Sequence, residues 1–271
     1  MAGRAYTNLG WAYSALGDHR LSRQATLNSV AQAEREGNLQ NYWFAQGNLL
    51  GNSYDVGLWD EALDLVVAME GAPDGARVLT ATAGEIRGRI LVARDRPDEG
   101  LRDMLSAIEG GRSSNNLQSH WPALASYARA AFGLGLGNKA RAALDEITSA
   151  IAAHSSVGYP SSWHVEYVRM LRDTGRMGEA RDFSAQLTQG RWRSVCDAIT
   201  AGDDVGAADL AAETGNRPLE AELRLSAATT LASEGRIAEA EAQLGLARAF
   251  WETVGATAFL RRADELIAAA S

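Results

Sequence analysis

The stretch NLGWAYSALGDHRLS at residues 8–22 holds the pattern that decides the fold, because its second half, GDHRLS at 17–22, recurs along the chain. Each copy has a turn residue, Gly or Asp, and a small residue five positions later. The later copies read GLWDEA at 57–62, DRPDEG at 95–100, GNKARA at 137–142, GRMGEA at 175–180, GDDVGA at 202–207 and GRIAEA at 235–240. A phrase that returns every 27 to 42 residues is typical of a repeat protein.

The chemistry of this phrase predicts a pair of antiparallel helices. Glycine tolerates the positive φ with which many helices end. An acidic or amide side chain just after the turn favours the start of the next helix. The small residue, Ala62 or Ala180 for example, then lies one turn into the second helix and lets two backbones cross closely. We therefore expect a helical hairpin that is repeated about seven times along the 271 residues.

Composition supports an all-α fold and limits the partners. Ala occurs 50 times and Leu 30 times, against 20 for Val and Ile together, which favours helix over strand. A net charge of −8 repels phosphate backbones, so we expect no direct contact with nucleic acid. No run of about 18 apolar residues is present, so we expect no membrane span. The single Cys196 excludes an internal disulfide, fits a reducing, cytoplasmic location, and is expected to be buried and inert.

The repeated residues resemble the tetratricopeptide repeat (TPR). The first copy matches the consensus of that family in order at Asn8, Leu9, Gly10, Tyr13, Gly17, Asp18 and Ser22. The resemblance implies an all-α, right-handed superhelical solenoid of about seven hairpins with a C-terminal capping helix. We expect residues 1–271 to form one such domain, with repeats at 3–38, 39–74, 75–112, 118–156, 160–189, 190–216 and 217–254 and the capping helix at 256–270.

A second resemblance lies at the C-terminus. The segment LGLARAFWETVGATAFLRRADELIAAAS at 244–271 is similar to the closing segment of bacterial multidomain signalling proteins. Those proteins, adenylate/guanylate cyclase-type and LuxR-type regulators, place an AAA-type ATPase before a TPR array. The resemblance implies a sensory or regulatory region that binds a protein or peptide. Two alternatives stay open: a small-ligand (inducer) sensing domain of a MalT-like or LuxR-type transcriptional regulator, and the non-catalytic portion of an adenylate/guanylate cyclase.

The sequence contains little that points to catalysis. The stretch GLGLGNK at 133–139 lacks the spacing of a phosphate-binding loop, and no HExxH or GxSxG motif occurs. His154, Ser155, Ser161, Ser162 and His164 crowd one loop without a fixed acidic partner, so we interpret them as turn residues. Arg261 and Arg262 are expected to be surface cations of the last helix, with contact to a partner as the alternative. We therefore expect no enzyme, no cofactor and no metal site within this chain.

The functional residues are expected on the concave face, which the first helix of each hairpin lines in TPR arrays. Asn can pair with a peptide backbone, Arg can bind a carboxylate in bidentate fashion, and aromatic rings supply contact area. The alternative is that these side chains cap helices or pack between hairpins. The candidates are Arg4, Asn8, Trp11, Asn48, Tyr54, Asp55, Glu85, Arg89, Tyr127, Arg169 and Arg172.

The N-terminal end of the array is expected to expose apolar side chains. Solenoids need polar end caps, because a terminal repeat otherwise exposes the face that a neighbour would cover. Leu9 and Trp11 come almost at once after the first residue, with no helix before them. We expect this end to meet an upstream ATPase or effector domain of the same polypeptide, or a second copy of the chain.

Overall fold

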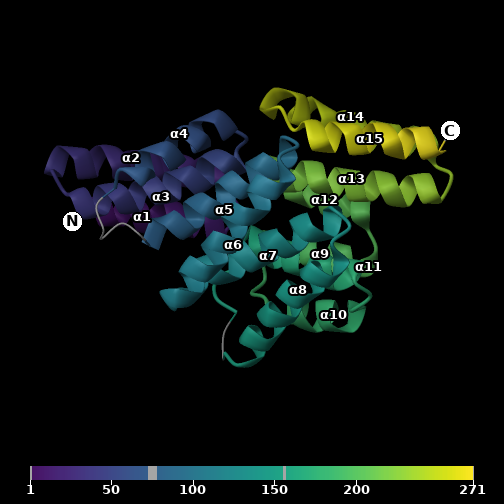
Figure 1. The fold of residues 1–271 in the computed structure, drawn as a ribbon, viewed down its shortest axis with the longest axis horizontal. Coiled ribbons are helices and arrows are strands. Elements are labelled where there is room, and N and C mark those ends of the chain that lie inside the picture. The colour runs from purple at the N-terminus through teal and green to yellow at the C-terminus, as the bar shows by residue number, and fades with distance from the viewer. Residues whose placement is uncertain (1, 73–77, 155–156, 271) are drawn as a thin grey trace.

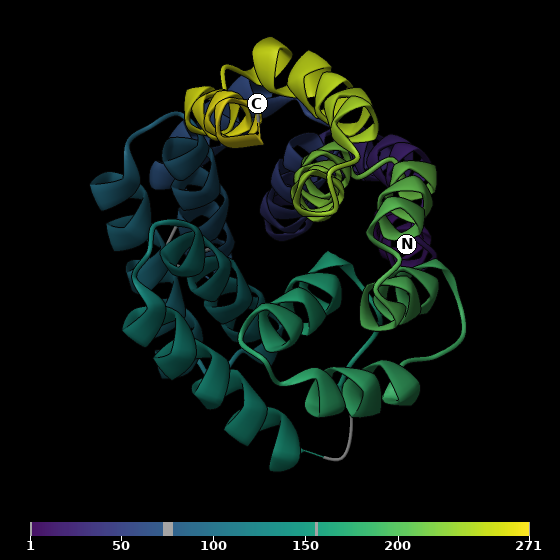
Figure 2. The same cartoon turned by 90° about the vertical axis from the view of Figure 1, so that its right-hand side faces the viewer.

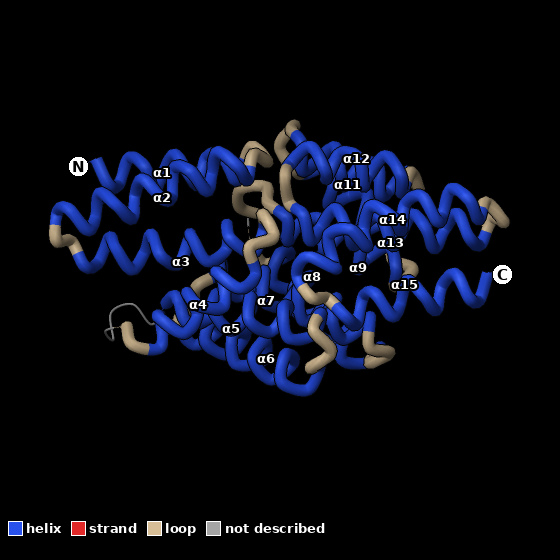
Figure 3. Tube along the Cα trace, turned by 90° about the horizontal axis from the view of Figure 1, so that it is seen from above, coloured by secondary structure: helices blue, strands red, loops and turns tan. Residues whose placement is uncertain are grey.

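The computed structural model describes residues 2–72, 78–154 and 157–270, and within them every regular element is a helix (Figures 1 and 3). Each helix packs against the next one in the chain, as the hairpin pattern predicts. The helices are α1 (Ala2–Ala15), α2 (His19–Glu36), α3 (Leu39–Asp55), α4 (Trp59–Glu70), α5 (Val78–Ala93), α6 (Pro97–Ser113), α7 (Leu117–Gly133), α8 (Gly137–Ala152), α9 (Ser162–Asp173), α10 (Met177–Gln186), α11 (Arg191–Ala201), α12 (Asp204–Thr214), α13 (Arg217–Ser233), α14 (Ile237–Val254) and α15 (Thr257–Ala270).

The hairpin turns lie where the sequence predicts them, with one correction. Gly17, Gly57, Gly175 and Gly235 all have positive φ and all lie between two paired helices. In the fourth hairpin the turn residue is Gly135, with φ of 74°, and not Gly137, which begins α8. The short phrase GLGLGNK contains three glycines, and the backbone uses the middle one. With this correction the first five turn residues lie 38 to 40 residues apart.

The small residue five positions after each turn is buried, as the repeat predicts. Ala62, Ala180 and Ala240 are fully buried where the two helices of a hairpin cross. In the fourth hairpin this residue is Ala140, which is also fully buried, whereas the predicted Ala142 is exposed. The same two-residue shift explains both errors. The boundaries of the repeats themselves stay a prediction.

Polar side chains begin several helices by accepting a hydrogen bond from the first turn. Asp18 accepts from the Leu21 amide at 3.0 Å at the start of α2, and Asn216 accepts from the Leu219 amide at 3.1 Å at the start of α13. An oxygen at this position satisfies an amide that the helix itself leaves unpaired. Asp18 thus marks the start of the second helix of the first hairpin, and Asn216 marks the start of the first helix of the last hairpin.

The array of hairpins curves so far that its last helices return to its first ones. Figure 2 shows the helices arranged around a central axis, with α13 to α15 beside the N-terminal helices. The packing agrees, because α13 contacts α3 and α15 contacts α5. One hydrophobic cluster contains Leu50 and Ile90 from the early hairpins together with Leu244 and Trp251 from α14. The solenoid thus closes into a ring through a shared core.

Hydrogen bonds reinforce this closure at the turns of the early hairpins. They join Arg191 to the carbonyl of Gly17, Trp192 to the carbonyl of Ser14, Asn216 to Asp55, Arg94 to the carbonyl of Val254, and Arg261 to Asp95. In each case residues more than 150 positions apart in sequence are brought into contact. We call this set the closing contacts.

The first helix exposes apolar side chains. Leu9 and Trp11 on α1 are 42% and 45% exposed, and Leu16, directly after the end of α1, is 65% exposed. Trp11 packs edge-on against Tyr159 with ring centroids 4.1 Å apart, so a single aromatic residue covers part of this surface. No helix among the described residues has the length and apolar character that would let it cross a membrane.

Candidate binding site

A pocket of about 340 Å³, which we call the central pocket, is lined by the first helices of several hairpins and by the last helices of the array. Tyr54 comes from α3, Arg89 from α5, Arg129 from α7, and Glu166 from α9. Trp59 of α4 and two residues of α6 line it as well, and α13, α14 and α15 complete the wall, so both ends of the array contribute to one site. Helices from distant parts of the sequence therefore meet at this pocket only because the array closes.

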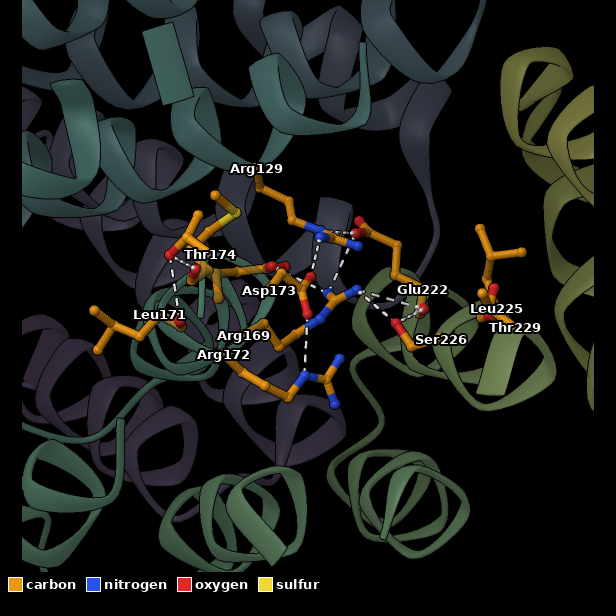
Figure 4. Close-up of polar contacts among 12 residues, drawn as sticks. Arg129, Arg169, Leu171, Arg172, Asp173, Thr174, Glu222, Leu225, Ser226 and Thr229 are labelled. Atoms are coloured by element: carbon orange, nitrogen blue, oxygen red, sulfur yellow. Dashed lines mark hydrogen bonds and ion pairs between the residues drawn. The ribbon is translucent and has the colours of Figure 1, made fainter. Parts of the chain in front are cut away.

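One half of the wall is a network of paired charges centred on Arg169, which is fully buried (Figure 4). Its Nη1 lies 3.1 Å from Glu166 Oε2 and 3.3 Å from Glu222 Oε2. Arg129 adds a second cation, with Nη1 2.9 Å from Asp173 Oδ2 and Nε 3.5 Å from Glu222 Oε2. These residues come from α7, α9 and α13, so the network joins three hairpins across the axis.

The network continues onto α5. Arg89 lies 3.5 Å from Glu166 and 3.7 Å from Glu85, one turn before it on the same helix. Ser126 donates to Glu85 Oε1 at 2.7 Å. The guanidinium carbon of Arg89 lies 4.7 Å from the centroid of the Tyr54 ring, a distance typical of a cation–π contact. Every charge in this part of the wall therefore has a partner.

Two opposing effects set the pKa values in the network: burial, which disfavours the charged form of each group, and the ion pairs, which favour it. Burial raises the pKa of Glu85, with Arg89 acting against it. Burial also works to raise the pKa of Glu222, but the nearby positive charges of Arg169 and Arg129 outweigh it and lower that pKa. Burial works to lower the pKa of Arg89, but the surrounding acidic groups, Glu166 among them, outweigh it and raise that pKa. Glu222 is therefore held as the carboxylate at the centre of the network.

The other half of the wall is aromatic. Trp59 stacks on Tyr54 with centroids 5.5 Å apart and meets Phe250 edge-on at 5.7 Å. Trp251 and Phe259 stack at 5.2 Å. These rings fix each other in place and present apolar surface to the pocket. The pocket thus combines a polar side with an apolar side, as binding sites for small molecules commonly do.

Arg262 lines the pocket as well, which corrects the expectation that it is a surface cation. It is half-buried on α15, and its guanidinium carbon lies 5.8 Å from the centroid of the Phe259 ring. A Cβ placed on Gly133 of α7 would lie 3.2 Å from its Nη1, so the guanidinium rests against that helix. Its neighbour Arg261 is the more exposed of the two and pairs with Asp95.

The structure brings four of the predicted residues together at this site. Tyr54 and Arg89 line the pocket, and Glu85 and Arg169 belong to the charge network directly behind it. Two more lie at the margins of the same network. Asp55 lies 3.1 Å from His19 and accepts from Asn216 at 3.0 Å, and Arg172 pairs with Asp173 and Asp204.

The remaining predicted residues lie elsewhere. Arg4, Asn8 and Trp11 are exposed on α1, and Asn48 is half-buried on α3. Tyr127 is buried in a hydrophobic cluster of the middle hairpins, which corresponds to packing between hairpins rather than to a free binding surface. These five residues do not line the central pocket.

Sequence reasoning missed Arg129, Glu166, Glu222 and the aromatic residues of α14 and α15. One signal was available, because Glu85 precedes Arg89 by four residues and Glu166 precedes Arg169 by three, which places each pair on one helix face. The role of Arg262 carried no such signal, since it depends on closure of the ring.

The loop with several Ser and His residues is structural where it is described. His164 is fully buried, its Nε2 lies 3.0 Å from the Val157 carbonyl, and its Nδ1 accepts from the Ser161 amide at 3.1 Å. Burial lowers the pKa of His164 to about 4. Ser155 lies outside the described residues. Cys196 is fully buried, as predicted, and burial raises the pKa of its thiol. Among the described residues no cluster of three or more His, Cys, Asp or Glu side chains is placed to hold a metal ion.

Comparison with known proteins identifies the fold. No protein-family model matches the sequence, and a search of curated proteins gives no match. Among solved structures, the apo form of the quorum sensor NprR from B. thuringiensis is similar, with a TM-score of 0.53 and 16% sequence identity. The alignment covers 92% of this chain and 65% of the NprR chain, so this chain spans somewhat less than two thirds of that protein. The chain is therefore an all-α, TPR-like solenoid of helical hairpins.

Proposed function

We propose that the chain is a peptide-binding scaffold that senses a signal, and that the central pocket is where the ligand binds. The observation that carries the proposal is the pocket itself, a partly polar and partly aromatic site that is lined by residues of nine helices from both ends of the array. The similarity of the fold to a quorum sensor, a protein that detects a signalling molecule, supports it. Within this proposal the ligand is a short peptide.

A small-molecule ligand is the second candidate, and the volume of the pocket favours it. Ligand pockets usually range from about 300 to 1,000 Å³, and this one, at about 340 Å³, is at the lower end. It accommodates a small molecule or the end of a peptide rather than a long segment. On either candidate the chain serves as the sensory region of a bacterial signalling protein, with an effector domain or a second copy as its protein partner. The exposed Leu9 and Trp11 on α1, together with Leu16 directly after it, fit such a contact.

Filling the pocket tests the proposal. Ala130 lines the pocket on α7, so Ala130→Trp places an indole where a ligand would lie. Ala142→Trp is the matched control, because Ala142 is exposed on α8. We expect a pooled library of short peptides to slow hydrogen exchange in α5, α13 and α15 of the wild type and of Ala142→Trp, but not of Ala130→Trp. A pooled set of small organic molecules tests the second candidate in the same way. Protection that persists in Ala130→Trp, or no protection with either pool, would contradict the proposal.

A further inference from the structure

Arg262 differs from the other arginines around the pocket because no carboxylate among the described residues pairs with it. Arg89, Arg129, Arg169 and Arg261 each have a carboxylate oxygen within 3.5 Å. In the part of the chain that the structure describes, no ion pair or hydrogen bond is found for the Arg262 guanidinium, which lies beside the Phe259 ring and against α7. A half-buried guanidinium that lines a cavity without an acceptor carries an unmatched positive charge.

The groups around Arg262 do not supply the missing acceptor. Glu222 is engaged by Arg169 and Arg129, and Glu265 lies beside Arg261 at 3.9 Å. Burial, together with the neighbouring positive charge of Arg129, lowers the pKa of Arg262, although the negative charges of Glu222 and Glu265 act against this. A negative group brought into the pocket would therefore find a cation that is already in place and already partly desolvated.

The charge balance of the wall limits what that negative group can be. Four arginines line the pocket beside four acidic side chains, and three of these arginines, Arg89, Arg129 and Arg261, already pair with carboxylates. The wall therefore carries no excess positive charge and can take one negative charge at Arg262, but not several. A doubly charged phosphate would leave an excess of negative charge beside Glu166 and Glu222, which also line the pocket. Guanidinium binds carboxylate through two parallel hydrogen bonds, which suits a planar monoanion.

The aromatic half of the wall determines the rest of the ligand. Phe250, Trp251 and Phe259 lie on the α14–α15 side of the pocket, the side from which Arg262 also comes. An apolar or aromatic body attached to the carboxylate would cover these rings while its charged end meets Arg262.

We infer that the central pocket binds a monocarboxylate with an apolar or aromatic body, and that Arg262 is the residue that recognises the carboxylate. This inference rests on the proposed function, because it names the ligand class for the same pocket. Two sources carry this chemistry: a small organic acid and the C-terminal carboxylate of a short peptide. The two differ in what is attached to the carboxylate and can be separated by experiment.

The test is equilibrium dialysis of the full chain with mass-spectrometric detection, in two arms. The first arm uses pooled small aromatic and aliphatic acids, each beside its uncharged primary amide. The second uses pooled short peptides with free C-termini, each beside its C-terminally amidated form. Arg262→Gln removes the cation at similar size, Arg262→Lys restores a charge without the planar fork, and Arg181→Gln on α10 is the matched surface control.

We expect at least one acid or free-terminus peptide to be retained by the wild type and by Arg181→Gln, with its amide retained at least tenfold less. Arg262→Gln is expected to weaken binding about tenfold or more, and Arg262→Lys to recover part of it. Whichever arm shows this pattern identifies the source of the carboxylate.

Two results would overturn the inference in distinguishable ways. Equal binding of acids and their amides would refute carboxylate recognition. So would binding that is unchanged in Arg262→Gln but lost in Ala130→Trp. Either result would still leave the pocket as the binding site. Failure of the wild type to retain any member of either pool would overturn both the inference and the proposed function. Circular dichroism and thermal melts of each variant exclude loss of the fold as the cause.

Discussion

The hairpin crossings and the central pocket are built from opposite kinds of residue. At the crossings, Ala62, Ala140 and Ala240 are fully buried, and it is their small size that lets the helices approach. Around the pocket, Arg169 is just as completely buried, and Glu166 nearly so, and their charges are matched by Glu222 and Arg89 of other hairpins. The crossings therefore depend on volume and the pocket wall depends on charge balance. The two regions should respond to different classes of substitution.

The largest effect is expected from breaking the charge network. Arg169→Met leaves Glu166 and Glu222 buried with fewer cations beside them, and an uncompensated buried charge costs about 3–5 kcal/mol. Urea titration of wild type and variant measures the loss in the free energy of unfolding. The triple variant with Glu166→Leu, Arg169→Met and Glu222→Leu should lose less, because the charges leave together. A triple variant less stable than Arg169→Met would show that the network contributes more than charge compensation.

A smaller loss is expected from overfilling a crossing. Ala140→Leu inserts a large side chain between α7 and α8 and should cost about 1–3 kcal/mol. Ala142→Leu makes the same change two residues further on, at an exposed position, and should stay within about 0.5 kcal/mol of the wild type. Thermal melts of the pair decide between the two assignments of the fourth hairpin. Equal losses in both variants would mean that neither position is a crossing.

His164 is buried in the neutral form, in contrast to the charged residues of the pocket wall, and it should make the stability of the protein depend on pH. Burial lowers the pKa of His164 to about 4, whereas the unfolded chain has a value of about 6.5. Between these values the unfolded state binds a proton that the folded state does not, so this contribution to stability falls as the pH falls. The expected loss is about 2 kcal/mol between pH 7.5 and pH 5.

The pH effect has its own direct measurement. An NMR titration of His164 should show the neutral ring persisting to about pH 4. A midpoint near that of a free histidine would remove this group as the source of any acid sensitivity. Urea titrations at the two pH values then report how much stability is lost.

A structural feature is predictable from this sequence when residues close together in the chain determine it, and is harder to predict when distant residues do. The turns at Gly17, Gly57 and Gly175 are determined by a few neighbouring residues, and the spacing of small residues reveals the helices on either side. The error at Gly137 arose because Gly135 and Gly137 suit a turn equally well by composition, and packing of Ala140 decides between them.

The pocket is less predictable, because its residues meet only through closure of the ring. Glu85, Arg89 and Arg169 were chosen for their place on inner helices, and they do lie in or behind the wall. Arg4 and Asn8 satisfy the same pattern but are exposed on α1. Periodicity along one helix says which face points inward, but not which helices from opposite ends of the chain will face one another.

The closing contacts have a consequence for how the protein unfolds. In an open repeat array each unit touches only its neighbours, so stability is roughly a sum along a line and the end units fray first. Here Trp192 holds the end of α1, and Val254 and Arg261 are held by the turn between α5 and α6. Neither terminal hairpin can detach without also exposing residues from the far end of the sequence. The array should therefore unfold with the cooperativity of a globular domain, although it is built from repeats.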